Sequence, residues 1–304
     1  MTRQSTTIWA IDPFADKRTQ LKVAQHLKEW MRQSPNTIEP ASVLNPGQLR
    51  LPTDTPDVRE KFKTAAQKAF EKITQATKLP NLGEPSLIYC PEYSQRRSVL
   101  TFLDYAKEKK ADLIAVGTHA RAGVERWLLG SFAEALILQS TIPLLIVNPK
   151  THLPNKIKTI LFPTDLSEAS EKGLDRLIPD LKRLKAKLIL FHKMDYVLPE
   201  TYSMIYRSDI YETYLKEDEA RRYRALEKWE KKLSSEGIDV EIIIDEKAEF
   251  IPKAITKAAK KYKAQVIALV TQTGPASAAI LGSIARQVVR SSDCPIWSWH
   301  PPQK

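Results

Sequence analysis

Cysteine, glycine and long apolar runs are all scarce in this chain of 304 residues, and the shortages exclude whole classes of protein. Two cysteines, Cys90 and Cys294, cannot build the disulfide framework of a small secreted scaffold, so we expect reduced thiols. No apolar run is long enough to span a bilayer, and the opening MTRQSTTIWAIDPF lacks the apolar core of a signal peptide. We therefore expect a cytoplasmic protein without a membrane partner.

Motifs for most catalytic chemistries are also missing. The five histidines show no metal-ligand spacing, so we expect no metal site built by the protein itself. The chain lacks GxSxG, HExxH and GxxxxGKS/T sequences, which leaves esterase, zinc-protease and P-loop activities without support. No general base is evident, so we expect no catalytic residues and, at most, slow ATP hydrolysis.

The net charge of +11 fits either nucleic acid or a small anion as a partner. The basic residues stand beside acidic ones at helical spacing, as in EDEARRYRALEKWEKKL, which is typical of a solvated helix face. No zinc finger, RNA-binding motif or aromatic-basic patch accompanies them. A nucleic-acid partner is therefore the weaker expectation, and a nucleotide fits the charge equally well.

The chain repeats itself at a nearly constant offset, which sets its domain organisation. Two pairs of segments lie 152 positions apart: LLGSFAEALI (128–137) with ILGSIARQVV (280–289), and STIPLLIVNP (140–149) with SDCPIWSWHP (292–301). Further upstream, Asp12 matches Asp165 at an offset of 153. We infer an ancestral duplication and predict one domain over 1–150 and a second over 156–304.

Both halves show the same order of strands and helices. Strands that are apolar on both faces alternate with amphipathic helices, which predicts an α/β fold with a parallel sheet covered on both sides. The expected strands are 6–11, 41–44, 86–90, 112–116 and 143–147, then 158–162, 186–192, 239–244, 265–270 and 295–299. The expected helices are 16–33, 57–78, 95–109 and 131–139, then 168–184, a helix within 208–235, 249–262 and 283–291.

One segment, GTHARAGVERWLLGS (117–131), holds three of the nine glycines between a strand and a helix. Ligands of parallel sheets bind at the carboxyl ends of strands, and a helix N-terminus offers free N–H groups to phosphate. Gly117 and Gly130 would let the backbone approach such an anion, and Ser131 would donate its hydroxyl. Asp12 ends the first strand at the same edge. The alternatives stay open: the glycines end a strand and form a turn, and Asp12 caps a helix.

The spacing Gly117-x2-Ala120-x9-Gly130-Ser131 resembles the signature G-x2-G-x9-G-S/T of the universal stress protein (UspA-like) family. The strand end PTDLSEAS (163–170) is similar to the opening of that family's domains, and the likeness covers nearly the whole chain as a tandem pair. The resemblance implies two five-stranded, Rossmann-like domains of the adenine nucleotide alpha hydrolase type, which bind ATP or AMP, with or without Mg, and act in stress responses. It also implies that the final strands pair in an intramolecular pseudo-dimer, where Trp297 and Trp299 alternate on one face.

The resemblance places the ligand contacts mainly in the first domain. By position, Asp12 would meet the adenine or ribose, and Val43 would pack on the base. The remaining contacts to the ribose and phosphates would come from Gly117, His119, Ala120, Gly130, Ser131 and Phe132. The weaker counterparts in the second domain are Asp165, Gly282 and Ser283. For His119, an exposed loop histidine is the alternative interpretation.

Departures from the family pattern bear on binding. Ala120 replaces the second motif glycine, so its methyl group would crowd the ligand or strain a left-handed backbone. In the second half Val270 replaces the first glycine, and Pro275 stiffens a loop that is one residue shorter. We therefore expect nucleotide binding to centre on the first domain and to be weak or absent in the second.

Three functions remain open at this point. They are a nucleotide-responsive regulator, a stress-associated interaction module that does not bind nucleotide, and a slow ATPase. The tyrosine-rich tract 196–214 is a candidate surface for an unknown protein partner, although a loop packed back on the sheet is the favoured interpretation. A single tandem chain and a homodimer of such chains both fit the pattern.

Overall fold

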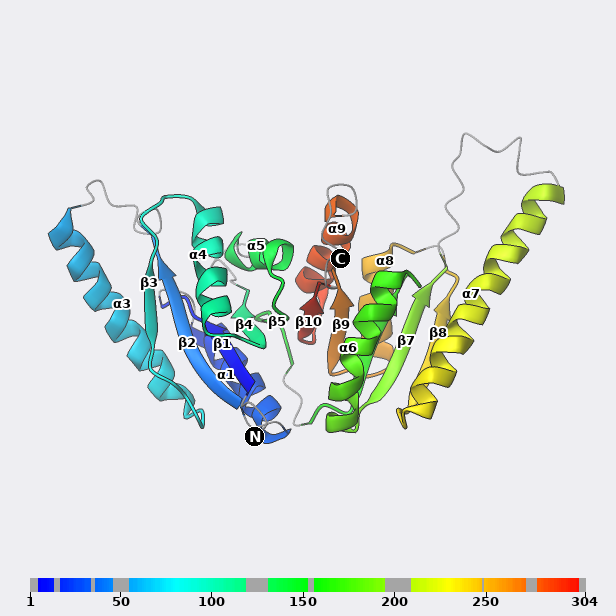
Figure 1. The fold of residues 1–304 in the computed structure, drawn as a ribbon, viewed down its shortest axis with the longest axis horizontal. Coiled ribbons are helices and arrows are strands. Elements are labelled where there is room, and N and C mark those ends of the chain that lie inside the picture. The colour runs from blue at the N-terminus through cyan, green and yellow to red at the C-terminus, as the bar shows by residue number, and fades with distance from the viewer. Residues whose placement is uncertain are drawn as a thin grey trace.

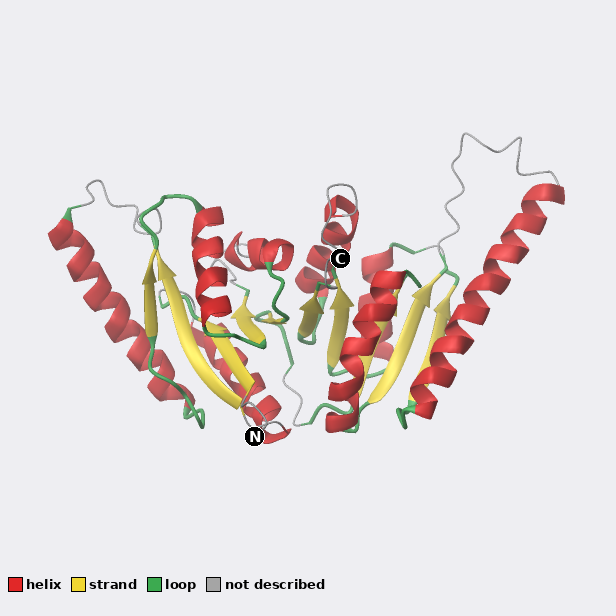
Figure 2. Cartoon of the chain, in the orientation of Figure 1, coloured by secondary structure: helices red, strands yellow, loops and turns green. Residues whose placement is uncertain are grey.

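In the computed structural model, ten strands form one continuous sheet with helices on both faces (Figures 1 and 2). The structure describes residues 5–13, 17–33, 36–45, 55–118, 131–152, 156–194, 209–247, 249–271 and 278–300. The strands of the first half are β1 (Ser5–Ala10), β2 (Asn36–Leu44), β3 (Ser86–Tyr89), β4 (Leu113–Gly117) and β5 (Leu144–Val147). Those of the second half are β6 (Thr159–Thr164), β7 (Lys187–Lys193), β8 (Val240–Asp245), β9 (Val266–Val270) and β10 (Ile296–Trp299).

The helices alternate with these strands, as the sequence predicts. They are α1 (Lys17–Gln33), α3 (Pro56–Thr77), α4 (Gln95–Glu108) and α5 (Ser131–Gln139), then α6 (Glu168–Leu184), α7 (Asp209–Ser235), α8 (Ile251–Lys261) and α9 (Ala278–Ser291). Their buried apolar residues fall into two clusters, one on each face of the sheet. Helices α1, α3, α6 and α7 cover one face, and α4, α5, α8 and α9 cover the other.

Strand order confirms the two-fold repeat. The sheet runs β3-β2-β1-β4-β5-β10-β9-β6-β7-β8, so the second half repeats the order of the first in mirror sequence. Neighbours within each half are parallel, and β5 pairs with β10 in the antiparallel direction. The chain is therefore two five-stranded parallel units joined through their final strands, as the expected pseudo-dimer requires.

Two expected boundaries are wrong, and each has a local cause. Strand β2 begins at Asn36 rather than at residue 41, although Pro40 lies within it. The N–H of Ile38 points to Asn81 O (3.0 Å), away from β1, and alternate residues share this side. The missing N–H of Pro40 would therefore point toward β3. Because β3 pairs with β2 only from Ala41 onward, no strand hydrogen bond is lost at Pro40.

Helix α9 begins at Ala278, five residues before the expected start. The added residues, AAILG, include good helix formers, and tertiary packing tolerates a glycine within a helix. Gly282 and Ser283 consequently belong to the body of α9 and do not form the turn that precedes it. The tyrosine-rich tract lies largely outside the described residues, which resume at residue 209.

The contact between the two halves, which we call the seam, follows the sequence repeat residue by residue. Leu145 pairs with Trp297 across β5 and β10, and these two positions are 152 apart. The pseudo-two-fold axis therefore passes between them. On the same axis, Glu134 of α5 accepts from Arg286 of α9 at 2.7 Å, and this pair is again separated by 152 positions.

Two reciprocal polar contacts close the seam. Asn148 Nδ2 donates to Val289 O (3.2 Å) and Ser292 O (2.6 Å) at the end of α9. In the opposite direction, His300 Nε2 lies 2.9 Å from Ile137 O in α5. Because 148 matches 300 and 137 matches 289 at an offset of 152, each final strand caps the last helix of the other half.

Two glycines set how closely a helix approaches the sheet in each half. A Cβ on Gly117 would lie 2.7 Å from Thr19 Cγ2 of α1, and a Cβ on Gly173 of α6 would collide with Val270 Cγ2. Val270 occupies the position that Gly117 holds in the first half. The same close approach is thus allowed by a strand glycine in one half and by a helix glycine in the other. Neither glycine has a positive φ, so the requirement is for space.

Removing the seam amide tests its contribution to stability. We expect Asn148→Ala to lower the free energy of unfolding by about 1–3 kcal/mol, because two carbonyls at the buried end of α9 lose their side-chain donor. Urea unfolding followed by circular dichroism measures the change. Ser291→Ala, which removes an exposed hydroxyl at the end of α9, is the control. A loss below about 0.5 kcal/mol for Asn148→Ala would show that water replaces the amide.

The glycine exchange makes a second prediction. Gly173→Ala should cost about 1–3 kcal/mol of stability through overpacking, and adding Val270→Gly should recover most of that loss by recreating the first half's arrangement. Gly237→Ala is the matched control, because alanine would be strained at the φ of 76° that Gly237 adopts, whereas its methyl group would have no atom within 4 Å. The stability lost in Gly237→Ala should not be recovered when Val270→Gly is added. An unrescued Gly173→Ala in the same urea assay would contradict the steric explanation.

Candidate functional site

The strand order reverses direction between β1 and β4, and a cavity lies at the carboxyl ends of the strands there. Its volume is about 50 Å³. The lining residues come from the ends of β1, β2 and β4 and from helices α4 and α5: Ala10, Ile11, Asp12, Ala41, Ser42, Val43, Phe102, Val116, Gly117, Phe132 and Ala133. The structure therefore brings together residues from five separate elements at the edge that the sequence predicts.

Four of the expected contacts meet in this cavity: Asp12, Val43, Gly117 and Phe132. Val43 is buried, and the ring of Phe132 packs edge-on against Phe102 with centroids 5.5 Å apart. Ser131 is the exposed first residue of α5 and does not line the cavity. The other expected contacts, His119, Ala120 and Gly130, lie outside the described residues.

The volume of this first cavity is small. Sites for small organic molecules are usually about 300–1,000 Å³, whereas this one is about 50 Å³. Its walls are mainly apolar, with the Asp12 carboxylate and the Ser42 side chain as polar groups. The described residues therefore do not by themselves enclose a molecule of that size.

The second half has a larger cavity at the equivalent place. It measures about 350 Å³ and lies at the carboxyl ends of β6, β7 and β9, beside α6, α7, α8 and α9. The lining residues are Pro163, Thr164, Asp165, Ser170, Phe191, His192, Lys193, Arg222, Ile251, Ile255, Leu269, Val270, Ile284 and Ala285. Asp165 is the counterpart expected from the sequence, and Val270 forms part of the apolar wall.

Hydrogen bonds at the N-terminus of α6 organise Asp165. Its Oδ1 accepts from Ser167 N (3.0 Å) and from Ser170 Oγ (2.6 Å), while Ser167 caps the helix by accepting from Ser170 N (3.2 Å). Burial acts to raise the pKa of Asp165, but these hydrogen bonds outweigh it and hold the pKa below its ordinary value. The carboxylate is thus charged at neutral pH and takes part in helix capping, the alternative role that the sequence leaves open for Asp12.

Basic residues that line the second cavity were not anticipated from the sequence. His192 and Lys193 end β7, and Arg222 reaches in from α7. His192 Nδ1 lies 2.9 Å from Thr164 O, and burial, together with the charge of Arg222, holds its pKa below the ordinary value. The ring is therefore neutral at pH 7, donates from Nδ1, and presents Nε2 to Arg222 Nη1 at 3.3 Å.

A signal for part of this group is present in the sequence. The run FHK (191–193) places two basic residues at the end of an apolar strand, where a parallel sheet binds ligands. The contribution of Arg222 could not be found in this way, because only packing of α7 brings it 3.3 Å from His192. Arg222 is held in place by Asp218 Oδ2, which accepts from its Nε at 2.6 Å.

The chemistry available at both cavities is that of binding. Apolar walls suit a planar base, and Arg222 adds a guanidinium to the lining of the second cavity. The ammonium of Lys193 already donates to the carbonyls of Met194, Asp245 and Lys247. Across the described ranges, no group of three or more His, Cys, Asp or Glu side chains could hold a metal ion. The two thiols are unpaired, and burial raises the pKa of Cys294 to about 11, which suppresses its reactivity at neutral pH. None of the helices described is long and apolar enough to cross a membrane.

Comparison with solved structures supports the fold. A universal stress protein from Archaeoglobus fulgidus aligns over 98% of this chain and 97% of its own, with a TM-score of 0.69 and 16% identity. A functionally unknown protein from Pseudomonas aeruginosa aligns over 98% and 93%, with a TM-score of 0.60 and 15% identity. A universal stress protein solved in complex with cAMP matches 49% of this chain at 18% identity and a TM-score of 0.33.

Sequence comparison assigns both halves to one family. A universal stress protein of Methanocaldococcus jannaschii is 49% identical over 45 residues, and one of Bacillus subtilis is 34% identical over 86 residues. These matches span 15% and 28% of this chain, and 26% and 49% of the relatives. The model of the universal stress protein family matches residues 18–148 and again residues 156–298. The chain belongs to the universal stress protein family, with two copies of the family's fold in tandem.

Proposed function

We propose that this protein is a cytoplasmic, nucleotide-responsive regulator that binds ATP or AMP at the carboxyl edge of its sheet. The observation that carries the proposal is the meeting of Asp12, Val43, Gly117 and Phe132 around one cavity at the point where strand order reverses. In the first half, Asp12 would accept from the adenine or ribose and Val43 would pack on the base. The sequence GTHARAGVERWLLGS would supply the phosphate contacts through Gly130 and Ser131.

The second half is a further candidate for the same ligand class. Its cavity of about 350 Å³ falls within the usual range for small-molecule sites, and Arg222 brings a guanidinium to its lining. Val270 in place of glycine does not block the site by itself, because Gly173 makes room for its side chain. The expectation that binding centres on the first half remains a prediction, and the size of the second cavity is the reason to test both.

The regulatory role follows from what the sites contain. Among the described residues, both cavities offer apolar walls and hydrogen-bonding groups, and the Ser170 hydroxyl that donates to Asp165 in the second cavity belongs to the capping network of α6. Binding without rapid turnover suits a protein that reports nucleotide occupancy to a partner protein, which would contact the surface around the bound ligand. We include in the proposal the two domain boundaries, 1–150 and 156–304, and Mg as an accompanying ion for ATP.

Titration of matched variants tests the proposal. Nucleotide that co-purifies with the protein is released and identified, and ATP and AMP are then titrated with Mg by calorimetry. We expect Asp12→Asn to weaken the first site, and Asp165→Asn the second, by roughly 10-fold or more, the loss typical of a hydrogen bond to a charged group. Asp57→Asn, on the exposed start of α3, is the control.

The outcomes separate the alternatives. Binding lost in Asp12→Asn and in Gly130→Asp assigns the ligand to the first half, and binding lost only in Asp165→Asn assigns it to the second. Absence of binding at millimolar nucleotide contradicts the proposal and favours an interaction module. Hydrolysis above background that disappears in Gly130→Asp would instead identify a slow ATPase.

A further inference from the structure

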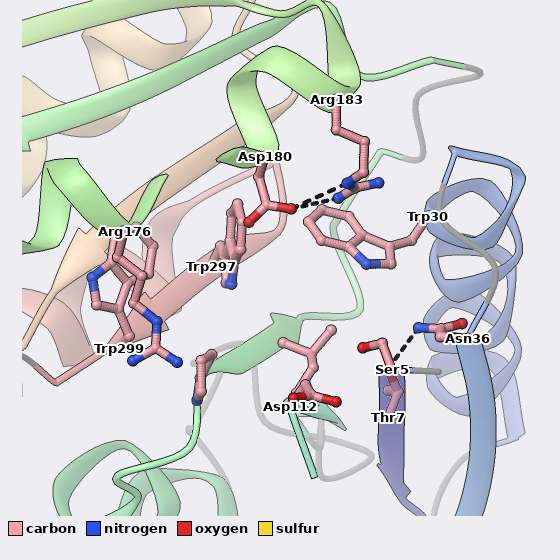
Figure 3. Close-up of a pocket in the computed structure, with 12 residues that line it drawn as sticks. Ser5, Thr7, Trp30, Asn36, Asp112, Arg176, Asp180, Arg183, Trp297 and Trp299 are labelled. Carbon is pink, nitrogen blue, oxygen red and sulfur yellow. Dashed lines mark hydrogen bonds and ion pairs between the residues drawn. The ribbon is translucent and has the colours of Figure 1, made fainter. Parts of the chain in front are cut away.

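A third cavity lies between the two halves, away from both nucleotide edges. It measures about 180 Å³ and is bounded by the amino ends of β1, β2 and β4, by α1 and α6, and by β10. Figure 3 shows Arg176, Trp299, Trp297, Asp180, Arg183 and Trp30 along one side, and Asp112, Ser5, Thr7 and Asn36 along the other. Residues of both halves therefore form its walls, and none of them lines the cavities at the carboxyl edge.

Buried polar atoms without partners line this cavity. They are Trp297 Nε1, Trp299 Nε1, Arg183 Nη1 and Asn36 Oδ1, and none has a hydrogen-bond partner within the described residues. Trp297 is 7% exposed, and Trp299 and Asn36 are each 2% exposed. Buried polar groups in folded proteins are nearly always hydrogen-bonded, so these atoms call for a partner that the chain does not supply. Three of the four are donors, which favours a ligand rich in acceptors.

The two indole nitrogens differ in whether they face the open space of the cavity. In Figure 3 the indole nitrogen of Trp297 lies on the edge of its ring that faces the Asp112 side of the cavity. Trp299 Nε1 lies close to the backbone of α6 at Gly173, where a Cβ would approach it to 3.1 Å. Trp297 is therefore the indole donor that faces the open space, and Trp299 contributes mainly its ring.

The carboxylates of the cavity are hydrogen-bonded to other groups, and one guanidinium makes no close contact with them. Asp180 Oδ1 accepts from Arg183 Nη2 (2.6 Å) and Nε (3.2 Å), and Asp112 Oδ2 accepts from Thr6 N (2.9 Å). Arg176, one turn before Asp180 on α6, makes no ion pair among the described residues, although its charge favours the ionised form of the Asp180 carboxyl and so acts to lower its pKa. Each carboxylate is thus engaged, whereas the guanidinium of Arg176 and the free Nη1 of Arg183 remain available.

Aromatic packing fixes the shape of the cavity. The ring of Trp30 meets that of Trp297 edge-on at 4.9 Å, and Trp297 meets Trp299 at 5.3 Å. The guanidinium of Arg183 lies over the ring of Trp30 at 4.7 Å, which links α6 of one half to α1 of the other. A volume of about 180 Å³ is close to that of a cavity that accepts a benzene molecule, about 150 Å³, so the ligand must be much smaller than a nucleotide.

We propose that this inter-half cavity binds a small oxyanion, either phosphate or a small carboxylate. Arg176 and Arg183 Nη1 supply the charge-assisted donors, and the indole N–H of Trp297 supplies a third. Asn36 lies on the opposite wall, where its Nδ2 donates to Thr7 Oγ1 at 2.8 Å and fixes the position of that wall. The bound oxyanion contacts both halves and so strengthens their association. This inference does not depend on nucleotide binding.

Thermal unfolding with a panel of anions tests the site. The probes are phosphate, sulfate, acetate, benzoate and chloride at equal ionic strength, applied to the full chain, with affinity measured by calorimetry and tryptophan fluorescence. We expect phosphate or a carboxylate to raise the melting temperature above the level set by chloride. Arg176→Gln should weaken that binding at least fivefold, and Trp297→Phe should do the same by removing the donor while keeping an aromatic ring.

Controls keep the result specific. Arg59→Gln, which removes the same charge from a distant exposed helix, should leave the affinity unchanged. Because Arg176 is exposed at the mouth of the cavity, Arg176→Gln preserves the fold, and it carries the test if Trp297→Phe does not fold. A rise in melting temperature with phosphate alone, or with carboxylates alone, identifies the ligand class. Equal melting-temperature shifts with chloride would show a general salt effect, and unchanged affinity in Arg176→Gln would show that Arg176 does not bind the anion. Either result would overturn the proposal.

Discussion

The antiparallel pairing of β5 with β10 is the contact on which the architecture depends. Each half alone would end in a short, fully buried strand with unpaired backbone groups along one side, which is a template for association. Pairing these two strands removes both edges at once and produces a single sheet with β3 and β8 at its ends. It also brings the equivalent helices α5 and α9 together, so that the core is continuous across the axis.

The same pairing determines where ligands can lie. Because the strands within each half are parallel, each half has one carboxyl edge, and the two nucleotide candidates are kept apart on either side of the axis. The amino edge of the first half, in contrast, faces α6 of the second, and the three tryptophans pack in that gap. Sites of the first kind are internal to a half, whereas the inter-half cavity exists only in the joined molecule.

Much of the fold could be predicted because it repeats. The offset of 152 residues and the alternation of strands and helices were sufficient to place both parallel units, and the resemblance to the universal stress protein family implied that the final strands pair. The start of α9 was missed because AAILG contains no start signal and its glycine reads as a turn. The early start of β2 was missed because the sequence does not show which side of Pro40 has a neighbouring strand.

The candidate sites were predictable only in part. Asp12, Gly117 and Asp165 could be placed because each ends or follows a strand, and strand ends share one edge of a parallel sheet. Arg222 could not be placed, because its position depends on the tertiary packing of α7 beside His192. The inter-half cavity depends on contacts such as Arg183 over Trp30, which join residues about 150 positions apart and leave no local pattern.

The paired glycines bear on how the two halves diverged. Position by position, Val270 looks like the loss of a family residue, yet the space it fills was provided by Gly173 on the facing helix. The order of such changes is constrained: a valine on the strand is tolerated only after the helix has become glycine, because the reverse order passes through a collision. Once Val270 is in place, the second half requires glycine at position 173, so a first helix without that glycine no longer fits against its strand. The two halves have therefore become fixed partners that share a fold but not interchangeable parts.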